Sequence, residues 1–167
     1  MIAPDWVRLM AAYNAEMNRR LYAAAARLPA AERTRDRSAF WGSIHGTLAH
    51  LLWGDRVWMA RFAGWPKPAL SQRDSATLEP NFATLQAARV EADAGILAWA
   101  VTLDADWLAG EMRWFSGSAQ REIGAPRALL VTHFFNHQTH HRGQVHAMLT
   151  AAGEQTGDTD LFLVVPP

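Results

Sequence analysis

The sequence contains no cysteine among its 167 residues. Disulfide bonds, thiolate metal ligands and a cysteine nucleophile are therefore excluded, and any bound metal must be held by nitrogen and oxygen atoms. The chain also lacks a run of about 18 uninterrupted apolar residues, the length that a membrane span requires. The first residues show no basic segment followed by an apolar one, so we expect no signal peptide and take the cytoplasm as the default location.

An excess of charge of either sign is also absent. Sixteen Lys and Arg residues balance sixteen Asp and Glu residues, and the sequence pI is about 7.1. This balance gives no general attraction to nucleic acid or to an anionic membrane. Half of the residues are apolar, enough for one domain over residues 1–167 to bury a sizeable core.

Helical periodicity dominates the chain, and no long segment alternates as a strand would. The four periodic segments are residues 4–28, 43–63, 80–107 and 126–152. Residues 111–123, between the third and fourth segments, read as a small β-hairpin. The predicted fold class is all-α, an up-down-type four-helix bundle with a long second crossover and this hairpin between helices 3 and 4.

The regions outside these helices are predicted to be irregular. Residues 30–37 are expected to form a solvated loop, and the tail at 158–167 is too short for a fifth helix. Ser38 and Ser43 are both candidates for the N-cap of the second helix.

The predicted second helix is apolar on more than one side. Leu48, Leu51 and Phe62 lie on one side, while Trp53 and Val57 lie on others. A helix that is wet on one face would not show this pattern. We therefore expect the helix to lie between neighbours and the chain to form a homodimer.

Histidine is abundant, and four of the seven histidines crowd residues 133–141. A turn of about 100° per residue places His137 and His141 within about 20° of the centre of the apolar face, with about 6 Å of rise between them. The face is defined by Leu130, Phe134 and Met148. The other histidines lie around it: His140 on the flank, His133 further off-centre on the same side, and His146 on the opposite side.

Two imidazoles on an apolar stripe need polar partners. An unpaired buried polar group costs about 1–3 kcal/mol, and a divalent ion would give both nitrogens a partner at the i, i+4 spacing. A single histidine on such a face is more often a hydrogen-bonded core residue. The centred pair of His137 and His141 is therefore a candidate metal site, which needs a third ligand from another helix.

The second helix offers His45, His50 and Asp55 as the third ligand. Asp55 falls in the middle of the face defined by Leu48, Leu51, Trp58 and Phe62, whereas His50 lies to its side. Periodicity alone therefore does not favour His50. Asp55 is alternatively a buried salt-bridge partner of an arginine such as Arg142.

Several neighbours of these histidines are candidates for a pocket or for supporting contacts. Trp53, Trp58 and Trp65 either line an apolar pocket near His50 or belong to the core or an interface. Arg142 and Gln144 flank the histidine pair. Gln144 turns toward the core face, where we expect it to donate a hydrogen bond to an imidazole, since metal-bound histidines usually require such a partner.

The sequence resembles the DinB-like family, the damage-inducible group of the DinB/YfiT superfamily, over nearly the whole chain. Three blocks carry the resemblance: Tyr13-Asn14 with Met17-Asn18, residues 43–50 continuing to Trp58 and Arg61, and Asn136-His137 with residues 140–144. It implies a four-helix bundle, usually a homodimer, with three histidines around a nickel or zinc ion that keeps open coordination positions. Matched onto this chain, the ligands are His50, His137 and His141, and the resemblance thereby decides between His50 and Asp55. It gives His45, His133 and His140 no ligand role.

The resemblance implies one divalent ion per chain and leaves more than one function open. One is a metal-dependent enzyme, either a thiol-dependent S-transferase with a low-molecular-weight thiol as cosubstrate or a hydrolase. The alternative is a non-catalytic metal-binding stress-response dimer, which a fourth protein ligand such as Asp55 or His133 would favour. A third reading is a bundle whose histidines only form hydrogen bonds.

Overall fold

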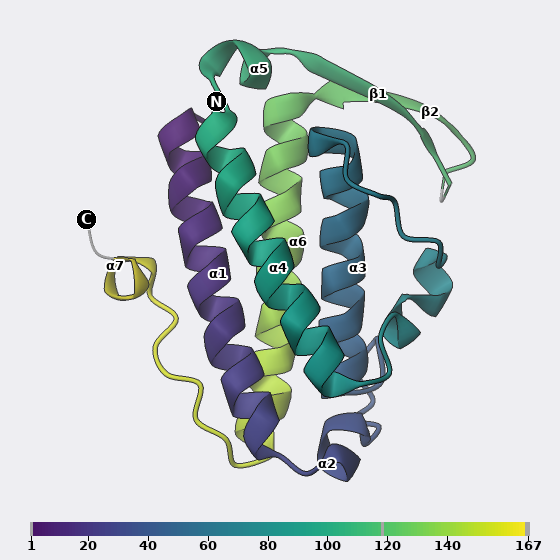
Figure 1. The fold of residues 1–167 in the computed structure, drawn as a ribbon, viewed down its shortest axis with the longest axis vertical. Helices are drawn as coiled ribbons and strands as arrows, with labels where there is room; N and C mark the ends of the chain where they lie inside the picture. Colours follow the sequence, from purple (N-terminus) through teal and green to yellow (C-terminus); the bar gives the residue numbers. More distant parts are fainter. Residues whose placement is uncertain (1, 118, 166–167) are drawn as a thin grey trace.

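The computed structural model describes residues 2–117 and 119–165, and most of them are helical. Four long helices lie side by side (Figure 1): α1 (Pro4–Arg27), α3 (Ile44–Ala63), α4 (Phe82–Thr102) and α6 (Arg127–Ala151). The shorter helices are α2 (Ala30–Thr34), the 3-10 helix η1 (Gln72–Thr77), α5 (Ala105–Ala109) and α7 (Leu161–Val164). No helix in the described ranges is long and apolar enough to cross a membrane.

Polar caps set the beginnings of three helices. The side chains of Ser43, Asn81 and Asp104 accept hydrogen bonds from backbone N–H groups in the first turns of α3, α4 and α5. Ser43, and not Ser38, is thus the cap of α3. At the other end of α3, Gly64 has a φ of 70°, a left-handed conformation that glycine adopts without a steric penalty.

The long helices do not follow a simple up-and-down order. Helices α3 and α4 are parallel, because Asp55 contacts Arg89 and the later Phe62 contacts the later Trp99. Helices α3 and α6 are antiparallel, because His50 contacts His141 whereas the later Trp58 contacts the earlier His133. α3 and α4 are parallel because the connection at 64–81, which contains η1, returns to the end where α3 began (Figure 1). This connection is the long second crossover that the sequence predicts.

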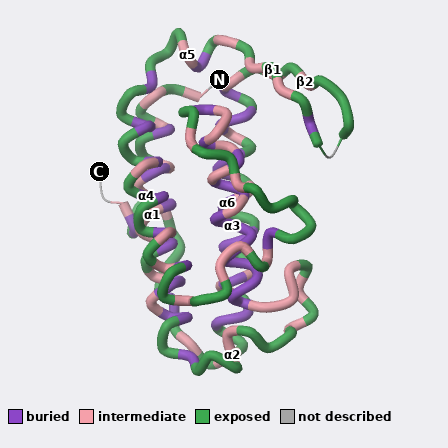
Figure 2. The backbone as a smooth tube through the Cα atoms, turned by 45° about the vertical axis from the view of Figure 1, so that its right-hand side comes forward, coloured by how far each residue is buried: buried purple, intermediate pink, exposed green. Residues whose placement is uncertain are grey.

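Helix α3 is buried along most of its length because α2, η1, α4 and α6 all contact it. Figure 2 shows buried residues along the long helices and exposed residues on many of the connections. The several apolar sides of α3 are therefore covered within one chain. The apolar sides of α3 therefore give no reason to expect a dimer contact on this helix.

The structure differs from the sequence predictions at three connections. Part of the expected loop at 30–37 forms α2, and the tail contains the four-residue α7. The predicted helix at 80–107 divides after Thr102, because Leu103 is extended and Asp104 caps a new helix. The hairpin is present as predicted: β1 (Glu111–Ser116) pairs antiparallel with β2 (Arg121–Pro126).

Candidate metal centre

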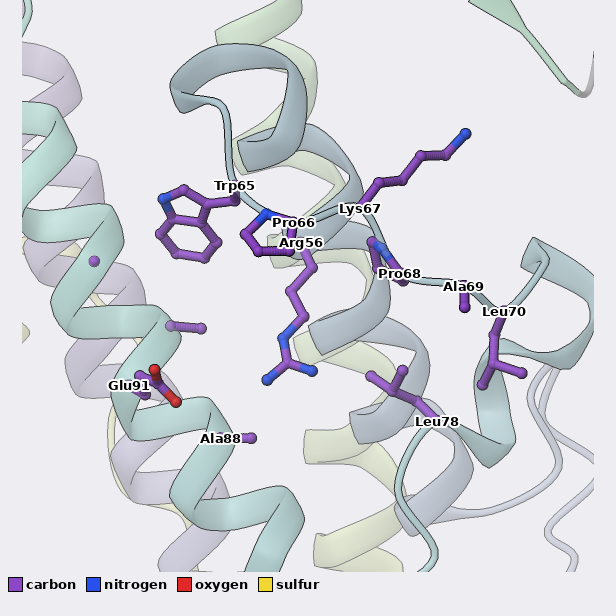
Figure 3. A pocket seen from close by; sticks show the side chains of 12 residues that line it. Arg56, Trp65, Pro66, Lys67, Pro68, Ala69, Leu70, Leu78, Ala88 and Glu91 are labelled. Atoms are coloured by element: carbon purple, nitrogen blue, oxygen red, sulfur yellow. The ribbon is translucent and has the colours of Figure 1, made fainter.

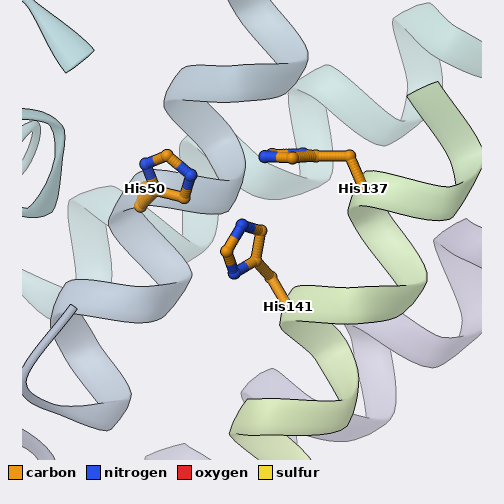
Figure 4. Close-up of side chains that lie close together, drawn as sticks. All are labelled: His50, His137 and His141. Carbon is orange, nitrogen blue, oxygen red and sulfur yellow. The ribbon is translucent and has the colours of Figure 1, made fainter. Parts of the chain in front are cut away.

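The imidazoles of His50, His137 and His141 converge between α3 and α6 (Figure 4). One nitrogen from each ring lies within 4.8 Å of the others. The ring centroids are 5.4 Å apart for His50 and His137, 4.6 Å for His50 and His141, and 4.5 Å for His137 and His141. Small side-chain rotations would bring all three nitrogens to the distance of about 2.1 Å at which imidazoles hold a zinc ion.

Ser75 of η1 fixes the orientation of His50. The buried Ser75 hydroxyl donates its hydrogen to the Gln72 carbonyl at 2.6 Å, so its oxygen accepts from Nδ1 of His50 at 2.7 Å. The proton of His50 is thereby placed on Nδ1, and its Nε2 carries the free lone pair. This is the tautomer that a metal bound at Nε2 requires.

Gln144 plays the same part for His141. Its side-chain oxygen lies 2.8 Å from Nδ1 of His141 and accepts the proton there, again leaving Nε2 with a lone pair. The two residues are three positions apart on α6, so helix geometry alone brings them together. The contact agrees with the sequence prediction, but the predicted direction does not, because Gln144 was expected to donate and here accepts.

His137 packs against α3 where that helix has no side chain. A Cβ built on Gly54 would lie only 2.7 Å from Cε1 of His137, so no larger residue fits at position 54 without moving the ring. Nδ1 of His137 is buried and has no hydrogen-bond partner within the described chain. Coordination of this ring to an ion would compensate for the cost of burying it.

Two indoles enclose His50. The ring centroid of Trp41 lies 3.8 Å from that of His50 at an interplanar angle of 19°, and Trp53 lies 5.8 Å away at 25°. Trp53 also donates a hydrogen bond from Nε1 to the Leu70 carbonyl, which ties the connection at 64–81 to α3. These rings exclude water from one side of His50.

All three imidazoles are held in the neutral form. Burial lowers the pKa of His50 to about 3, and the nearby His141 lowers it further. Burial and the neighbouring histidines also lower the pKa of His137 to about 3, and burial lowers the pKa of His141. At neutral pH their lone pairs are therefore free to bind a metal.

The model of the DinB family matches residues 4–165, nearly the whole chain. The chain belongs to the DinB family. No curated protein and no solved structure gives a significant match. The family assignment agrees with the resemblance in the sequence, and the neutral, converging imidazoles of this DinB-family protein suit a divalent ion.

Asp55 lies outside the group of three histidines. Its carboxylate accepts hydrogen bonds from Arg89 at 2.5 Å and from Gln138 at 3.0 Å in the buried interior. Asp55 thus forms a buried ion pair with an arginine, as the sequence suggested, but the arginine is Arg89. Arg142, the arginine named from the sequence, is also buried and donates to Asn14.

Of the three tryptophans that were candidates for a pocket near His50, one lies at the site of this DinB-family protein and two lie elsewhere. Trp58 stacks on Phe62 and contacts His133, so it lies away from His50, whereas Trp53 lies beside it. Trp65 packs against both core clusters.

The remaining histidines have other surroundings. His45 is bonded through Nε2 to the Glu79 carbonyl at 2.7 Å, and His146 contacts Thr156 through Nδ1 at 2.7 Å. His133 and His140 are exposed beside His137 and His141, and neither belongs to the group of nitrogens that could share one ion.

Two contributors to the site were missed in the sequence, Trp41 and Ser75. Both lie in connections between the predicted helices, Ser75 in the 3-10 helix η1, where the sequence shows no periodicity that indicates which way a side chain points.

Proposed function

We propose that this DinB-family protein binds one zinc or nickel ion per chain through His50, His137 and His141, and that the ion serves a thiol-dependent S-transfer or a hydrolysis. The observation that supports this proposal is the convergence of three neutral imidazoles, two of which have their Nδ1 protons held by Ser75 and Gln144. Such partners are characteristic of metal-bound histidines.

The donor set favours a catalytic over a structural site. Structural zinc sites have four protein ligands, whereas catalytic sites have three and an open position. Asp55 is engaged by Arg89 and Gln138, and the His133 ring centroid lies 6.1 Å from that of His137. A bound divalent ion with an open position would lower the pKa of a thiol or a water that reaches it.

The chain's own residues orient the ligands and limit access. Ser75 and Gln144 hold two imidazoles in the required tautomer, and the indole of Trp41 covers His50. His137 is the one ligand of the three that is only partly buried. Neutral ligands leave the full positive charge of an ion in place, which favours an anionic partner.

Metal analysis of untagged protein tests the ligand assignment. We expect about one divalent ion per chain in the wild type and none in His137→Ala. The control is His146→Ala, which removes a histidine of the same helix that faces Thr156 instead. Equal loss of metal from both variants would rule the assignment out.

A non-catalytic metal-binding dimer is the second candidate, because an ion shared by α3 and α6 would also fasten these helices together. Cobalt substitution separates the two functions. A visible spectrum that shifts on titration with azide or a small thiol supports an exchangeable position and hence catalysis. An unchanging spectrum means that protein ligands close the coordination sphere, and the structural function would then stand.

A further inference from the structure

A cavity of about 810 Å³ lies between α3, the connection at 64–81 and the tip of the hairpin, and none of the three histidines lines it. Trp41 and Trp53, which stack on His50, form part of its wall. Its lining includes three cationic residues, Arg61, Lys67 and Arg73, and within the described chain no Asp or Glu. The cavity therefore combines apolar walls with an uncompensated positive charge.

The positive charge of the cavity has no counterpart in the protein. In residues 2–117 and 119–165, no ion pair involves Arg61, Lys67 or Arg73. Arg61 is partly buried, and its guanidinium lies 4.5 Å from the centroid of the Trp58 ring. Partial burial of an unpaired guanidinium is unfavourable, and an anion in the cavity would relieve that cost.

Two residues that line the cavity lie on the same face of α3 as His50. At about 100° per residue, Val57 and Arg61 project within about 20° of His50, about 10 and 16 Å further along the helix axis. The Arg61 guanidinium lies over the rings of Trp58 and Trp114, 4.5 and 5.3 Å from their centroids, at the end of the cavity distant from His50. An elongated molecule that touches Arg61 reaches the histidines only past the indoles of Trp41 and Trp53, which lie between the cavity and His50.

The neighbouring cavity of about 740 Å³, on the other side of the same connection, has a smaller imbalance of charge. Arg56 and Glu91, on facing helices, both line it (Figure 3), so Glu91 offsets one of its two cationic residues, Arg56 and Lys67. Lys67 borders both cavities, and its side chain extends away from Glu91 (Figure 3). Arg56 also projects about 120° away from His50 around α3.

We propose that the cavity lined by Arg61, Lys67 and Arg73 binds the oxyanion group of an elongated organic molecule, a carboxylate or a phosphate on an apolar body. The other end of this molecule reaches His50, His137 and His141. The first statement stands without a metal, and the second rests on the proposed function.

The anion site is tested on the metal-free protein with two ligands of matched shape. Calorimetric titration compares 3-phenylpropionate with its neutral amide, and phenethyl phosphate shows which oxyanion is preferred. We expect both anions to bind at least about tenfold more tightly than the amide. The double variant Arg61→Gln/Arg73→Gln should lose this preference, whereas Arg8→Gln, which removes a charge from α1, should keep it.

Equal affinity for acid and amide, or a preference that survives the double variant, would overturn the anion site. If circular dichroism shows that the double variant is unfolded, Arg73→Gln alone decides the matter, because Arg73 is exposed on η1. This single change should lower the affinity for 3-phenylpropionate about threefold, and an unchanged affinity would also overturn the site.

The link to the metal is tested on the cobalt-loaded protein with 6-mercaptohexanoate and 6-mercaptohexanol. The acid should shift the visible spectrum at about tenfold lower concentration, and the double variant should abolish this advantage. An equal response to both thiols would refute the link while leaving metal binding intact. A protein that takes up no cobalt would refute the proposed function and leave the calorimetric result to stand by itself.

Discussion

Single hydrogen bonds decide which nitrogen is available for a metal in two of the three histidines. An imidazole has one free lone pair in the neutral form, and the partner of its other nitrogen selects which nitrogen carries it. Ser75 makes this selection for His50, and Gln144 makes it for His141. These two side chains therefore belong to the site although neither would touch the ion.

Replacing Ser75 by Ala is expected to lower the affinity for zinc about 10- to 100-fold, as loss of such partners does in other metal sites. The reason is that Nδ1 of His50 would no longer have a fixed acceptor. Competition with a chromophoric chelator measures the affinity. Ser71→Ala is the control, because the Ser71 hydroxyl donates to Asp74 and contacts no histidine; equal effects of the two changes would contradict the assigned role.

Replacing Gly54 by Ala should also weaken metal binding, by at least about tenfold, because its Cβ would meet Cε1 of His137 at 2.7 Å and displace the ring. Gly143→Ala is a matched control on α6, where nothing lies within 4 Å of the added Cβ. This control should retain its metal and gain up to about 1 kcal/mol of stability from better helix propensity. Unchanged zinc affinity in Gly54→Ala would show that His137 is free to shift.

The sequence supports residue-level predictions only where helical spacing fixes the geometry. Gln144 lies three positions from His141 on one helix, so their contact could be predicted. The sequence correctly indicated Asp55 as a candidate for a buried ion pair. Its partner Arg89 on α4 could not be predicted, because α3 is buried on nearly all sides and its angular pattern does not show which helix faces Asp55. Ser75 approaches His50 across 25 positions through a connection whose path no local pattern determines.

A buried charge network joins all four long helices, since Gln138 of α6 also donates to Asp55. Arg89 of α4 pairs with Asp55 of α3 at 2.5 Å and with Asp93 at 2.8 Å, and Asn18 of α1 donates to Asp93 at 2.9 Å. Burial raises the pKa of Asp93 to about 6 and raises that of Asp55. The Arg89 guanidinium is thus the ion-pair partner of both carboxylates, and removing it would leave them with only the more distant charge of Arg142.

Replacing Arg89 by Met is expected to destabilise the fold by about 3–5 kcal/mol, the cost of breaking a buried ion pair from one side. Urea unfolding monitored by circular dichroism measures the change. Arg19→Met provides the comparison, since Arg19 forms an exposed pair with Glu16 at 2.7 Å and should cost at most about 1 kcal/mol. Similar costs for the two variants would mean that the network contributes little.

At the scale of elements, the four long helices and the hairpin could be predicted, because each has a clear periodicity or turn signal. The break between α4 and α5 could not, because Leu103 continues the apolar pattern while Asp104 begins a new helix. The parallel arrangement of α3 and α4 depends on the path of the connection at 64–81. Periodicity carries no information about that path.

The homodimer remains a prediction for the whole molecule, but the structure suggests another surface for it. Val90 and Val101 of α4 are 65% and 67% exposed, and Leu97 between them is 37% exposed. These side chains form an apolar stripe on the outer side of α4 that a second copy of the chain could cover.

Light scattering at micromolar concentration should therefore give twice the 18.6 kDa mass of one chain. The double variant Val90→Asp/Val101→Asp should shift the mass to that of the monomer, because burying these carboxylates at an interface is unfavourable. A wild-type protein that runs as 18.6 kDa would exclude the homodimer. A variant that remains dimeric would place the interface elsewhere.

The stability of the metal-free protein should depend on pH through His137. Its pKa is about 3 in the folded chain, against about 6.5 when it is exposed in the unfolded chain. Between these values the unfolded chain binds one proton more at this residue, so the free energy of unfolding falls as the pH falls from 6.5 toward 3. The contribution is up to about 1.4 kcal/mol per pH unit.

Other buried groups titrate in the same range, and Asp93 acts in the opposite direction because burial raises its pKa to about 6. A folded acid with a raised pKa loses stability as the pH rises through that value. The comparison is therefore between the wild type and His137→Gln, with EDTA present and urea unfolding measured from pH 7 to pH 4. On acidification, the variant should lose less stability than the wild type, by about 1 kcal/mol per pH unit, because glutamine cannot take up the proton. Parallel pH profiles of the two proteins would contradict this prediction, because they would mean that the pKa of His137 in the folded chain is close to its value in the unfolded chain.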